Sequence, residues 1–296
     1  MKWKRVYPLH LLVLPSVLIL IIFQYIPMGG LVIAFQDYKP WFGIANSPWV
    51  GWDNFKFIFE YPDSKQVIWN TFIIAFSKIV AGLIVPFTFA LLLNEIRVMF
   101  FKRTVQTIVY LPHFLSWVIL GGILTDILSI NSGLANQFIT ALGFEAIPFL
   151  QNGDWFRTTI IVSDIWKEFG FSTIVYLAAI TSINPELYEA ATSDGANRWQ
   201  QVLHITIPSI VPIAVLLGAL SLGNILNAGF DQVFNLYNPL VYSKGDIIDT
   251  FVYRQGILGS QFSFSTAFGL FKSVISTILL VIFYRLAYKY ADYRIF

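Results

Sequence analysis

The sequence predicts an all-α polytopic membrane protein with about six transmembrane helices. Of its 296 residues, 56% are hydrophobic and only 12% are charged, and the mean hydropathy is +0.67. A chain of this length with so few charges is too apolar to fold as a water-soluble globule. Stretches of roughly 20 or more mostly apolar residues recur along it, and each is long enough to cross a bilayer as a helix.

The apolar stretches form one transmembrane domain over residues 1–296, without a separate soluble domain. The first stretch is too long, and lacks the small-residue cleavage site, to be a removed signal peptide. We expect kinks and not breaks at Pro15, Pro27, Pro86 and Pro112, because neighbouring helices satisfy the carbonyls that a proline frees. The predicted spans cover residues 9–35, 67–93, 104–128, 157–180, 209–230 and 266–288.

Basic residues near the span ends indicate the orientation. They gather at both termini and at the second and fourth connections, so these parts are predicted to be cytoplasmic. The opposite loops are longer, mix acidic with basic residues, and carry aromatic stretches such as PWFGIANSPWVGWDNF, which are typical of a membrane interface. The basic residues assigned to the cytoplasmic side are Lys2, Lys4, Arg5, Arg97, Lys102, Arg103, Arg198, Arg285, Lys289 and Arg294.

Between the fourth and fifth spans, residues 184–207 form a charged helical hairpin that we call the EAA hairpin. Asn184 before Pro185 is a helix N-cap with proline in the first turn, so a helix begins there. Gly195 supplies the left-handed residue that ends this helix. A second short helix follows, before Pro208 opens the fifth span.

The surface of the first hairpin helix is suited to a protein partner. Ala190 and Ala191 leave one face almost flat, so another protein can approach the backbone closely. Glu189 and Asp194 flank that face and offer charges to a basic partner. The alternative, equally compatible with these residues alone, is an amphipathic linker that lies on the membrane surface.

The hairpin resembles the EAA signature of the membrane subunits of bacterial ABC importers. The resemblance covers nearly the whole chain and is nearest to the carbohydrate branch, the polysaccharide and oligosaccharide permeases. Val202 and Leu203 stand where that family often has Phe, and His204 stands where it often has Lys. The matching residues are Glu189-Ala190-Ala191, Asp194-Gly195-Ala196 and Ile205-Thr206-Ile207-Pro208.

The resemblance implies a type I ABC importer permease fold, in which the hairpin is a coupling helix that docks in a cleft of a cytoplasmic ATPase. It also implies a bacterial cytoplasmic membrane location and a complex with a homologous second permease, two ABC ATPase subunits and an extracytoplasmic solute-binding protein. The substrate would be an oligosaccharide. The residues that it assigns to coupling are Glu189, Ala190, Ala191, Asp194, Gly195, Ala196 and Pro208.

The motifs that are missing fit this interpretation. The sequence has no G-x-x-x-x-G-K-[ST], so ATP and Mg would be held by a partner ATPase and not by this chain. It also lacks H-E-x-x-H, G-x-S-x-G and any cysteine, and its histidines, His10, His113 and His204, are far apart in sequence. We therefore expect no catalytic site, metal site or cofactor, and the net charge of +2 gives no reason to expect nucleic acid.

Ionisable residues inside predicted spans are the first candidates for a substrate pathway, because burying a charge in a bilayer is costly. In the fourth span, Asp164, Lys167, Glu168 and Phe171 share one helix face. Carboxylates, amides and lysines beside aromatic rings suit carbohydrate recognition, but the same residues could pair with neighbouring helices instead. The further candidates are Ser221, Asn224 and Asn227, in a stripe with Asp231, and Lys78.

Lysines within the spans suggest an anionic substrate. Lys78, Lys167 and Lys272 would each cost at least about 2.5 kcal/mol unpaired at the bilayer centre. Lys167 has Glu168 beside it and Asp164 one turn away, which could neutralise it. Lys78 and Lys272 have no acidic residue within a helical turn, which leaves the pathway or a partner permease, although each could also snorkel outward or pair structurally.

Two other functions remain open at this point. A secondary transporter would use the intramembrane carboxylates to carry ions, and should show inverted repeats and broken helices. An intramembrane enzyme acting on lipid or glycan would use Asp164 and Glu168 as acid and base. The sequence shows no inverted repeat, broken helix or nucleophile motif, which favours the importer.

Overall fold

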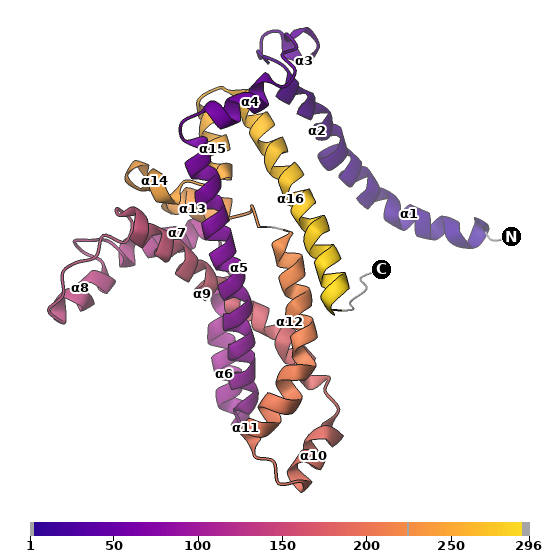
Figure 1. Cartoon of the computed structure of the whole chain (residues 1–296), viewed down its shortest axis with the longest axis vertical. Helices are drawn as coiled ribbons and strands as arrows, with labels where there is room; N and C mark the ends of the chain where they lie inside the picture. Colours follow the sequence, from indigo (N-terminus) through magenta and orange to yellow (C-terminus); the bar gives the residue numbers. More distant parts are fainter. Residues whose placement is uncertain (1–2, 224, 292–296) are drawn as a thin grey trace. The chain divides into compact units, whose positions relative to one another are not determined.

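The computed structural model describes residues 3–223 and 225–291. The chain forms two compact units, Met1–Ser64 with Phe251–Ser273 and Lys65–Thr250 with Val274–Phe296. Helices make up both units, and the described residues include no β-strand (Figure 1). Of the basic residues used to predict orientation, Lys2 and Arg294 lie outside the described residues.

The first unit begins with one long helical run that contains α1 (Trp3–Leu20), the π segment η1 (Ile21–Tyr25), α2 (Ile26–Met28) and the 3-10 segment η2 (Gly29–Phe35). The π segment comes just before Pro27, whose ring and missing N–H require a wider turn. The rest of the unit includes α3 (Gly43–Asn46), α4 (Asp53–Glu60), η6 (Arg254–Leu258) and the first part of α16 (Phe262–Ala291).

Aromatic rings hold the first unit together. Phe35 stacks on Trp49 with ring centroids 5.7 Å apart and also meets Phe55 at 5.2 Å. Tyr61 stacks on Phe264 of α16 at 5.4 Å. Aromatic pairs at these distances add about 0.5–1.5 kcal/mol beyond the area that they bury.

The second unit contains the EAA hairpin and most of the predicted spans. Its helices α5 and α15 continue into the first unit along the chain, and the second part of α16 also belongs to the second unit. The elements are α5 (Ser64–Glu95), α6 (Met99–Tyr110), η3 (Leu111–Phe114), α7 (Trp117–Ile127), α8 (Leu134–Ala141), α9 (Gly153–Thr181), α10 (Pro185–Ser193), α11 (Arg198–Gln201), η4 (Val202–Thr206), α12 (Ile207–Leu222), α13 (Phe230–Leu236), η5 (Pro239–Val241), α14 (Tyr242–Gly245) and α15 (Ile248–Tyr253).

Helix α9 is the main support of the second unit. Its buried residues recur about every three or four positions, from Phe156 and Ile160 through Lys167 to Gly170, so one face is packed along the helix. Gly170 lets α6 approach closely, because a Cβ at this position would lie 2.3 Å from the carbonyl oxygen of Val109. The middle of α9 is therefore held against α6 by backbone proximity.

Two apolar clusters fix the ends of α9. Near its N-terminus, Phe156 packs in a buried cluster with Ile74 of α5 and Val233 of α13. Near its C-terminus, Tyr176 packs in a second cluster with Ile210 of α12. These clusters leave the polar middle of α9 between them.

The third predicted span is broken in the structure, which corrects our expectation of a kink over residues 104–128. The chain bends by 105° between Met99–Phe114 and α7. Pro112 lies in the 3-10 turn η3 before the bend, and the hydroxyl of Ser116 accepts a hydrogen bond from the N–H of Ile119 at 3.4 Å. Because of this cap, α7 begins as a separate helix, whereas a kinked helix would have continued past the proline.

The fifth predicted span is shorter at its C-terminal end than expected. We predicted it over residues 209–230, but α12 ends at Leu222 and a loop leads to α13. Gly229, just before α13, has a φ of +92°, a left-handed conformation that does not occur inside an α-helix. The polar stripe expected from Ser221 to Asp231 therefore does not lie on one helix.

The second hairpin helix and the fifth span form one continuous run, Arg198–Leu222, where we had expected a separate short helix. Pro208 does not interrupt this run because the π segment η4 precedes it. There the N–H of Ile207 bonds to the carbonyl of Val202, and the wider turn makes room for the proline ring.

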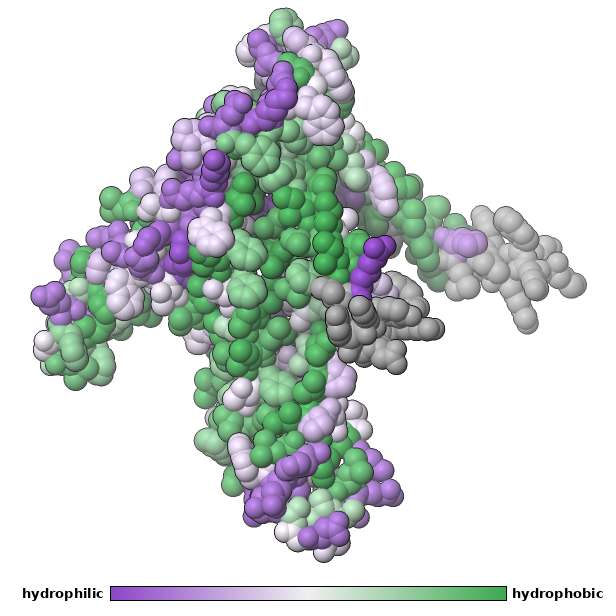
Figure 2. Space-filling model, viewed as in Figure 1, coloured by the Kyte–Doolittle hydropathy of each residue, from purple (hydrophilic) through white to green (hydrophobic). Residues whose placement is uncertain are grey.

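Within the described residues, four helical runs are long and apolar enough to cross a membrane, and the broken pair α6–α7 would add a fifth. They are His10–Phe35, Ser64–Glu95, Arg198–Leu222 and Phe262–Arg285. The fourth predicted span is occupied by α9, which has charged residues at its middle. Figure 2 shows hydrophobic surface over the long helices of the second unit, with hydrophilic residues gathered around α10 and α11.

Candidate functional site

The first helix of the EAA hairpin is capped at both ends as predicted. The side-chain oxygen of Asn184 accepts a hydrogen bond from the N–H of Glu186 at 3.1 Å, and Pro185 occupies the first turn. Gly195 has a φ of +80°. Its N–H and that of Ala196 close the last turn with two hydrogen bonds of 3.0 and 2.9 Å, which together form a Schellman motif.

The second half of the hairpin is fixed by side-chain amides. Asn197 and Gln200 form a reciprocal capping box, with hydrogen bonds of 2.9 and 2.7 Å between side chain and backbone. The amide of Gln201 donates to the hydroxyl of Thr192 at 3.0 Å and to the carbonyl of Ala196 at 3.1 Å. These bonds tie the end of α10 to α11, so the hairpin holds its own shape.

The residues assigned to coupling lie on the surface of this hairpin. Five of them are exposed, and two, Ala191 and Ala196, are half-buried. The carboxylates of Glu189 and Asp194 make no hydrogen bond or ion pair with any residue that the structure describes. The exposed members are Glu189, Ala190, Asp194, Gly195 and Pro208.

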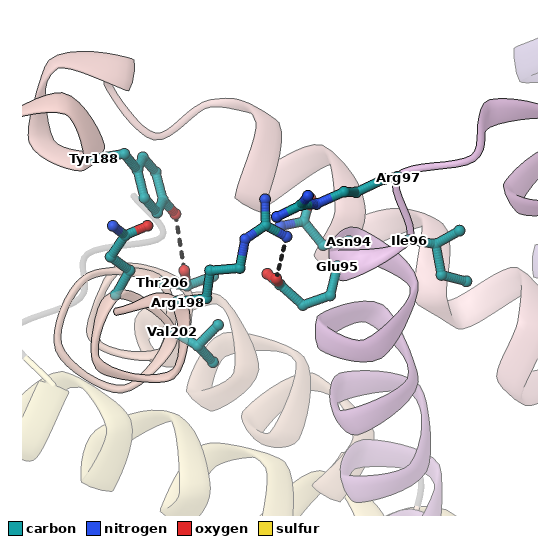
Figure 3. Close-up of a pocket in the computed structure, with 9 residues that line it drawn as sticks. Asn94, Glu95, Ile96, Arg97, Tyr188, Arg198, Val202 and Thr206 are labelled. Carbon is teal, nitrogen blue, oxygen red and sulfur yellow. Dashed lines mark hydrogen bonds and ion pairs between the residues drawn. The ribbon is translucent and has the colours of Figure 1, made fainter. Parts of the chain in front are cut away.

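Beside the hairpin, a cavity of about 370 Å³ opens against the end of α5 (Figure 3). Arg198 links the hairpin to α5 through an ion pair of 3.4 Å with Glu95. The hydroxyl of Tyr188 forms a hydrogen bond of 2.8 Å with the hydroxyl of Thr206. Displacement of α10 would therefore pull on α5 through Arg198, and through Tyr188 on η4, which continues into α12. The cavity is lined by Asn94, Glu95, Ile96, Arg97, Tyr188, Arg198, Gln201, Val202 and Thr206.

The predicted face of α9 meets the break between α6 and α7 in what we call the His113 cluster: His113, Lys167, Glu168 and Phe171. The ammonium of Lys167 donates to the carboxylate of Glu168 at 2.8 Å and to the carbonyl of His113 at 2.9 Å. The other oxygen of Glu168 lies 2.7 Å from Nδ1 of His113. The imidazole stacks on the ring of Phe171, with centroids 4.0 Å apart.

Asp164, one turn earlier, belongs to a second group that we call the Lys78 node. The ammonium of Lys78 lies 3.1 Å from Asp164 and donates to the carbonyl of Ala228 at 2.8 Å and to the side-chain oxygen of Gln232. The side chain of Lys78 is only 9% exposed. The acidic partner of Lys78 lies on α9 and not within its own helical turn, so Lys78 makes the structural pairing that the sequence left open as an alternative.

The candidates of the fifth span are not brought together with either group in the part of the chain that the structure describes. The hydroxyl of Ser221 bonds to the carbonyl of Leu217 in its own helix at 2.8 Å. Asn227 and Asp231 are exposed, in the loop and at the start of α13. Asn224 lies outside the described residues. Lys272 is half-buried in the first unit.

Sequence reasoning missed several residues of these sites. His113 could have been found, since a polar residue inside an apolar stretch is the same signal that selected Lys78. Gln232, Tyr188 and the Glu95–Arg198 pair carry no such signal, because their partners lie far away in sequence. Only the folded chain brings them together.

Comparison with known proteins identifies the family of this chain. Residues 78–296 match the family described as "Binding-protein-dependent transport system inner membrane component". The chain belongs to this family.

Close relatives of this permease support the same assignment. It is 44% identical, over 97% of its length and 90% of the relative, to the "Polygalacturonan/rhamnogalacturonan transport system permease protein YteP" of Bacillus subtilis (strain 168). It also resembles a chain in the crystal structure of a bacterial ABC transporter involved in the import of the acidic polysaccharide alginate, with a TM-score of 0.90, 38% identity and 98% coverage of both chains. A second structure shows that transporter with an alginate-bound periplasmic protein, with the same TM-score and identity and coverage of 98% and 97%.

The family decides among the functions that the sequence left open. The permease is a transport component with the fold of a type I ABC importer, and not an enzyme. Its polytopic, nearly all-helical structure confirms the predicted fold class. The likeness to a chain of an ABC transporter also argues against an ion-coupled secondary transporter.

Proposed function

We propose that the chain is one permease subunit of an ATP-driven importer that carries acidic oligosaccharides across the bacterial cytoplasmic membrane. The observation that supports this most is that the chain resembles two proteins named for acidic polysaccharides. One is named for polygalacturonan and rhamnogalacturonan and the other for alginate, and both cover almost the whole chain. Uronic acid units are the chemistry that these polymers share.

The complex would contain a homologous second permease, two cytoplasmic ATPase subunits and an extracytoplasmic solute-binding protein. The EAA hairpin would dock on one ATPase, with exposed Glu189 and Asp194 facing basic residues of that partner. ATP binding would close the ATPases and displace the hairpin, and the links through Arg198 and Tyr188 would carry this movement to α5 and α12. The partner must bind the two states of the permease unequally, since only differential contacts shift such an equilibrium.

Uptake by the complete transporter tests the proposal. The second permease, the two ATPase subunits and this chain are reconstituted in proteoliposomes with ATP inside, and labelled oligogalacturonides are added outside with the binding protein. We expect ATP-dependent accumulation, and its loss in Glu189→Lys because a repulsion replaces an attraction at the ATPase. Accumulation that persists without ATP but collapses with the ion gradient would contradict the proposal.

The orientation can be tested separately, because the chain has no cysteine. Ser193→Cys in the hairpin and Gln151→Cys before α9 both replace exposed residues. An impermeant thiol reagent added to intact cells should label position 151 and leave position 193 unlabelled until the cells are opened. Labelling of position 193 from outside would exclude docking of the hairpin on a cytoplasmic ATPase.

A further inference from the structure

The break between α6 and α7 lies beside the middle of α9, which occupies the fourth predicted span. Lys167, which donates to the carbonyl of His113, is the middle residue of α9, midway between Gly153 and Thr181. Ser116, in the break, is extended, with a ψ of 153°. Irregular backbone at membrane depth is tolerated where protein buries it or where it lines a water-filled cavity, and broken helices form substrate sites in many transporters.

The His113 cluster is partly exposed at this break. The side chains of His113 and Glu168 are 27% and 39% exposed. Phe171 is 43% exposed and Phe114 is 73% exposed, and both rings contact the imidazole, at 4.0 and 5.4 Å between centroids. Hydrogen-bonding edges and aromatic faces therefore lie side by side, which is the combination that binds sugars.

The partner of His113 determines which ring nitrogen is available. Because an ionised carboxylate only accepts hydrogen bonds, Nδ1 carries the hydrogen that is shared with Glu168. Nε2 has no hydrogen-bond partner among the residues that the structure describes. It accepts a hydrogen bond when the imidazole is neutral and donates one when the imidazole is protonated.

The charges around the break are balanced when His113 is neutral. Lys78 pairs with Asp164 and Lys167 with Glu168, and both lysine side chains are only 9% exposed. The two ammonium groups are thus occupied, and neither is placed to meet an anionic substrate. A uronate that enters beside this group needs a positive charge from another side chain.

His113 is the remaining group that can supply this charge. The charged groups that face it are Glu168 and Lys167 of α9, and Tyr110 lies one turn earlier on α6. Helix α7 carries no titratable residue before Asp126, near its far end. Histidine is the side chain whose ordinary charge change falls between pH 5 and 8.

We propose that His113 binds the carboxylate of a uronic acid unit and takes up one proton from solution as it does so. In the bound state Nδ1–H donates to Glu168 and Nε2–H donates to the substrate carboxylate, while Phe171 and Phe114 contact the sugar ring. This inference rests on the proposed function and identifies His113 as the residue that selects for substrate charge. Lys78 and Lys167 are positioning residues that keep Asp164 and Glu168 in place.

The test compares an acid with its own neutral ester. Uptake of trigalacturonate and of its methyl ester is measured in proteoliposomes that hold the complete transporter, at pH 6 and pH 8 on both sides. Affinity of the binding protein for both sugars is measured at each pH and does not change with variants of this chain. In the wild type, the apparent KM for the acid should rise about fivefold or more between pH 6 and 8, relative to the ester, because the imidazolium is lost.

His113→Gln retains hydrogen bonding but cannot gain a charge, so the acid-specific dependence on pH should disappear while uptake of the ester continues. His10→Gln is the matched control, since His10 is exposed in the first helical run, and it should keep the wild-type profile. Equal dependence on pH in His113→Gln and the wild type would overturn the inference. So would identical profiles for acid and ester in the wild type, which requires no variant to fold. Uptake of neither sugar by the wild type would instead contradict the proposed function, and the inference with it.

Discussion

The EAA hairpin and the middle of α9 each depend on one glycine, and for opposite reasons. Gly195 has a left-handed φ of +80°, yet a Cβ there would meet no atom within 4 Å. Gly170 needs no unusual φ, but a Cβ there would lie 2.3 Å from the backbone oxygen of Val109. The hairpin is thus limited by backbone conformation, and α9 is limited by packing.

The two regions also differ in the sequence separation of the residues that their hydrogen bonds join. Most of the hydrogen bonds that shape the hairpin join residues close in sequence, such as Asn184 with Glu186, two positions apart. Those of the α9 region join distant segments, such as Lys78 with Asp164, 86 positions apart. We therefore expect changes in α9 to lower stability, and changes in the hairpin to affect coupling more than stability.

Lys78→Met should have the largest effect on stability. It removes the charge that neutralises Asp164 and the donor to Gln232 inside the second unit. Breaking a buried pair from one side costs about 3–5 kcal/mol, so the free energy of unfolding in detergent should fall by about that amount. Lys78→Met combined with Asp164→Asn should be less damaging than the sum of the two single changes. Simple additivity would mean that the pair is not coupled.

Gly170→Ala should lower the free energy of unfolding by about 1–3 kcal/mol, because α6 must move to make room for the new methyl group. Gly82→Ala is the matched control. Gly82 lies inside α5, and a Cβ added there would meet no atom within 4 Å, so alanine should be neutral or stabilising by roughly 0.5–1 kcal/mol. Similar effects of the two changes, measured by unfolding in detergent, would contradict the packing role of Gly170.

Gly195→Val should leave the unfolding of the permease almost unchanged but abolish ATP-dependent uptake. A β-branched residue resists the left-handed conformation, which costs roughly 1–2 kcal/mol locally and should distort the end of α10. Gly195→Asn is the control, since asparagine tolerates this conformation and should retain more uptake. The measurements are uptake and co-purification of the ATPase. Normal uptake with valine would remove Gly195 from the coupling site.

Asn184→Ala should have the smallest effect. Loss of the cap on α10 costs roughly 1 kcal/mol, so backbone amides of the first turn should exchange with deuterium about fivefold faster. Asn184→Ser keeps a capping oxygen and should restore slow exchange. Faster exchange in α9 as well would show that the stability of α9 depends on the hairpin, contrary to our expectation.

The hairpin shows which structural features a short stretch of sequence can predict. The Asn184–Pro185 start and the Gly195 stop are confirmed, because caps and left-handed glycines depend on a few neighbouring residues. The break at Pro112 was not predicted, since kink and break differ only in whether Ser116 starts a new helix. The end of α12 at Leu222 was missed because the apolar character of the sequence continues beyond it.

The sequence by itself determined the all-α membrane class, the hairpin with its caps, and the polar residues at the middle of α9. These follow from hydropathy, helical spacing and short-range hydrogen bonds, which act within a few turns of the chain. Only the tertiary structure decided that Lys78 pairs with Asp164 and that Glu168 faces His113. Such pairs depend on which helices pack together, and in a low-dielectric interior the partner of a charge is set by that packing and not by distance along the chain.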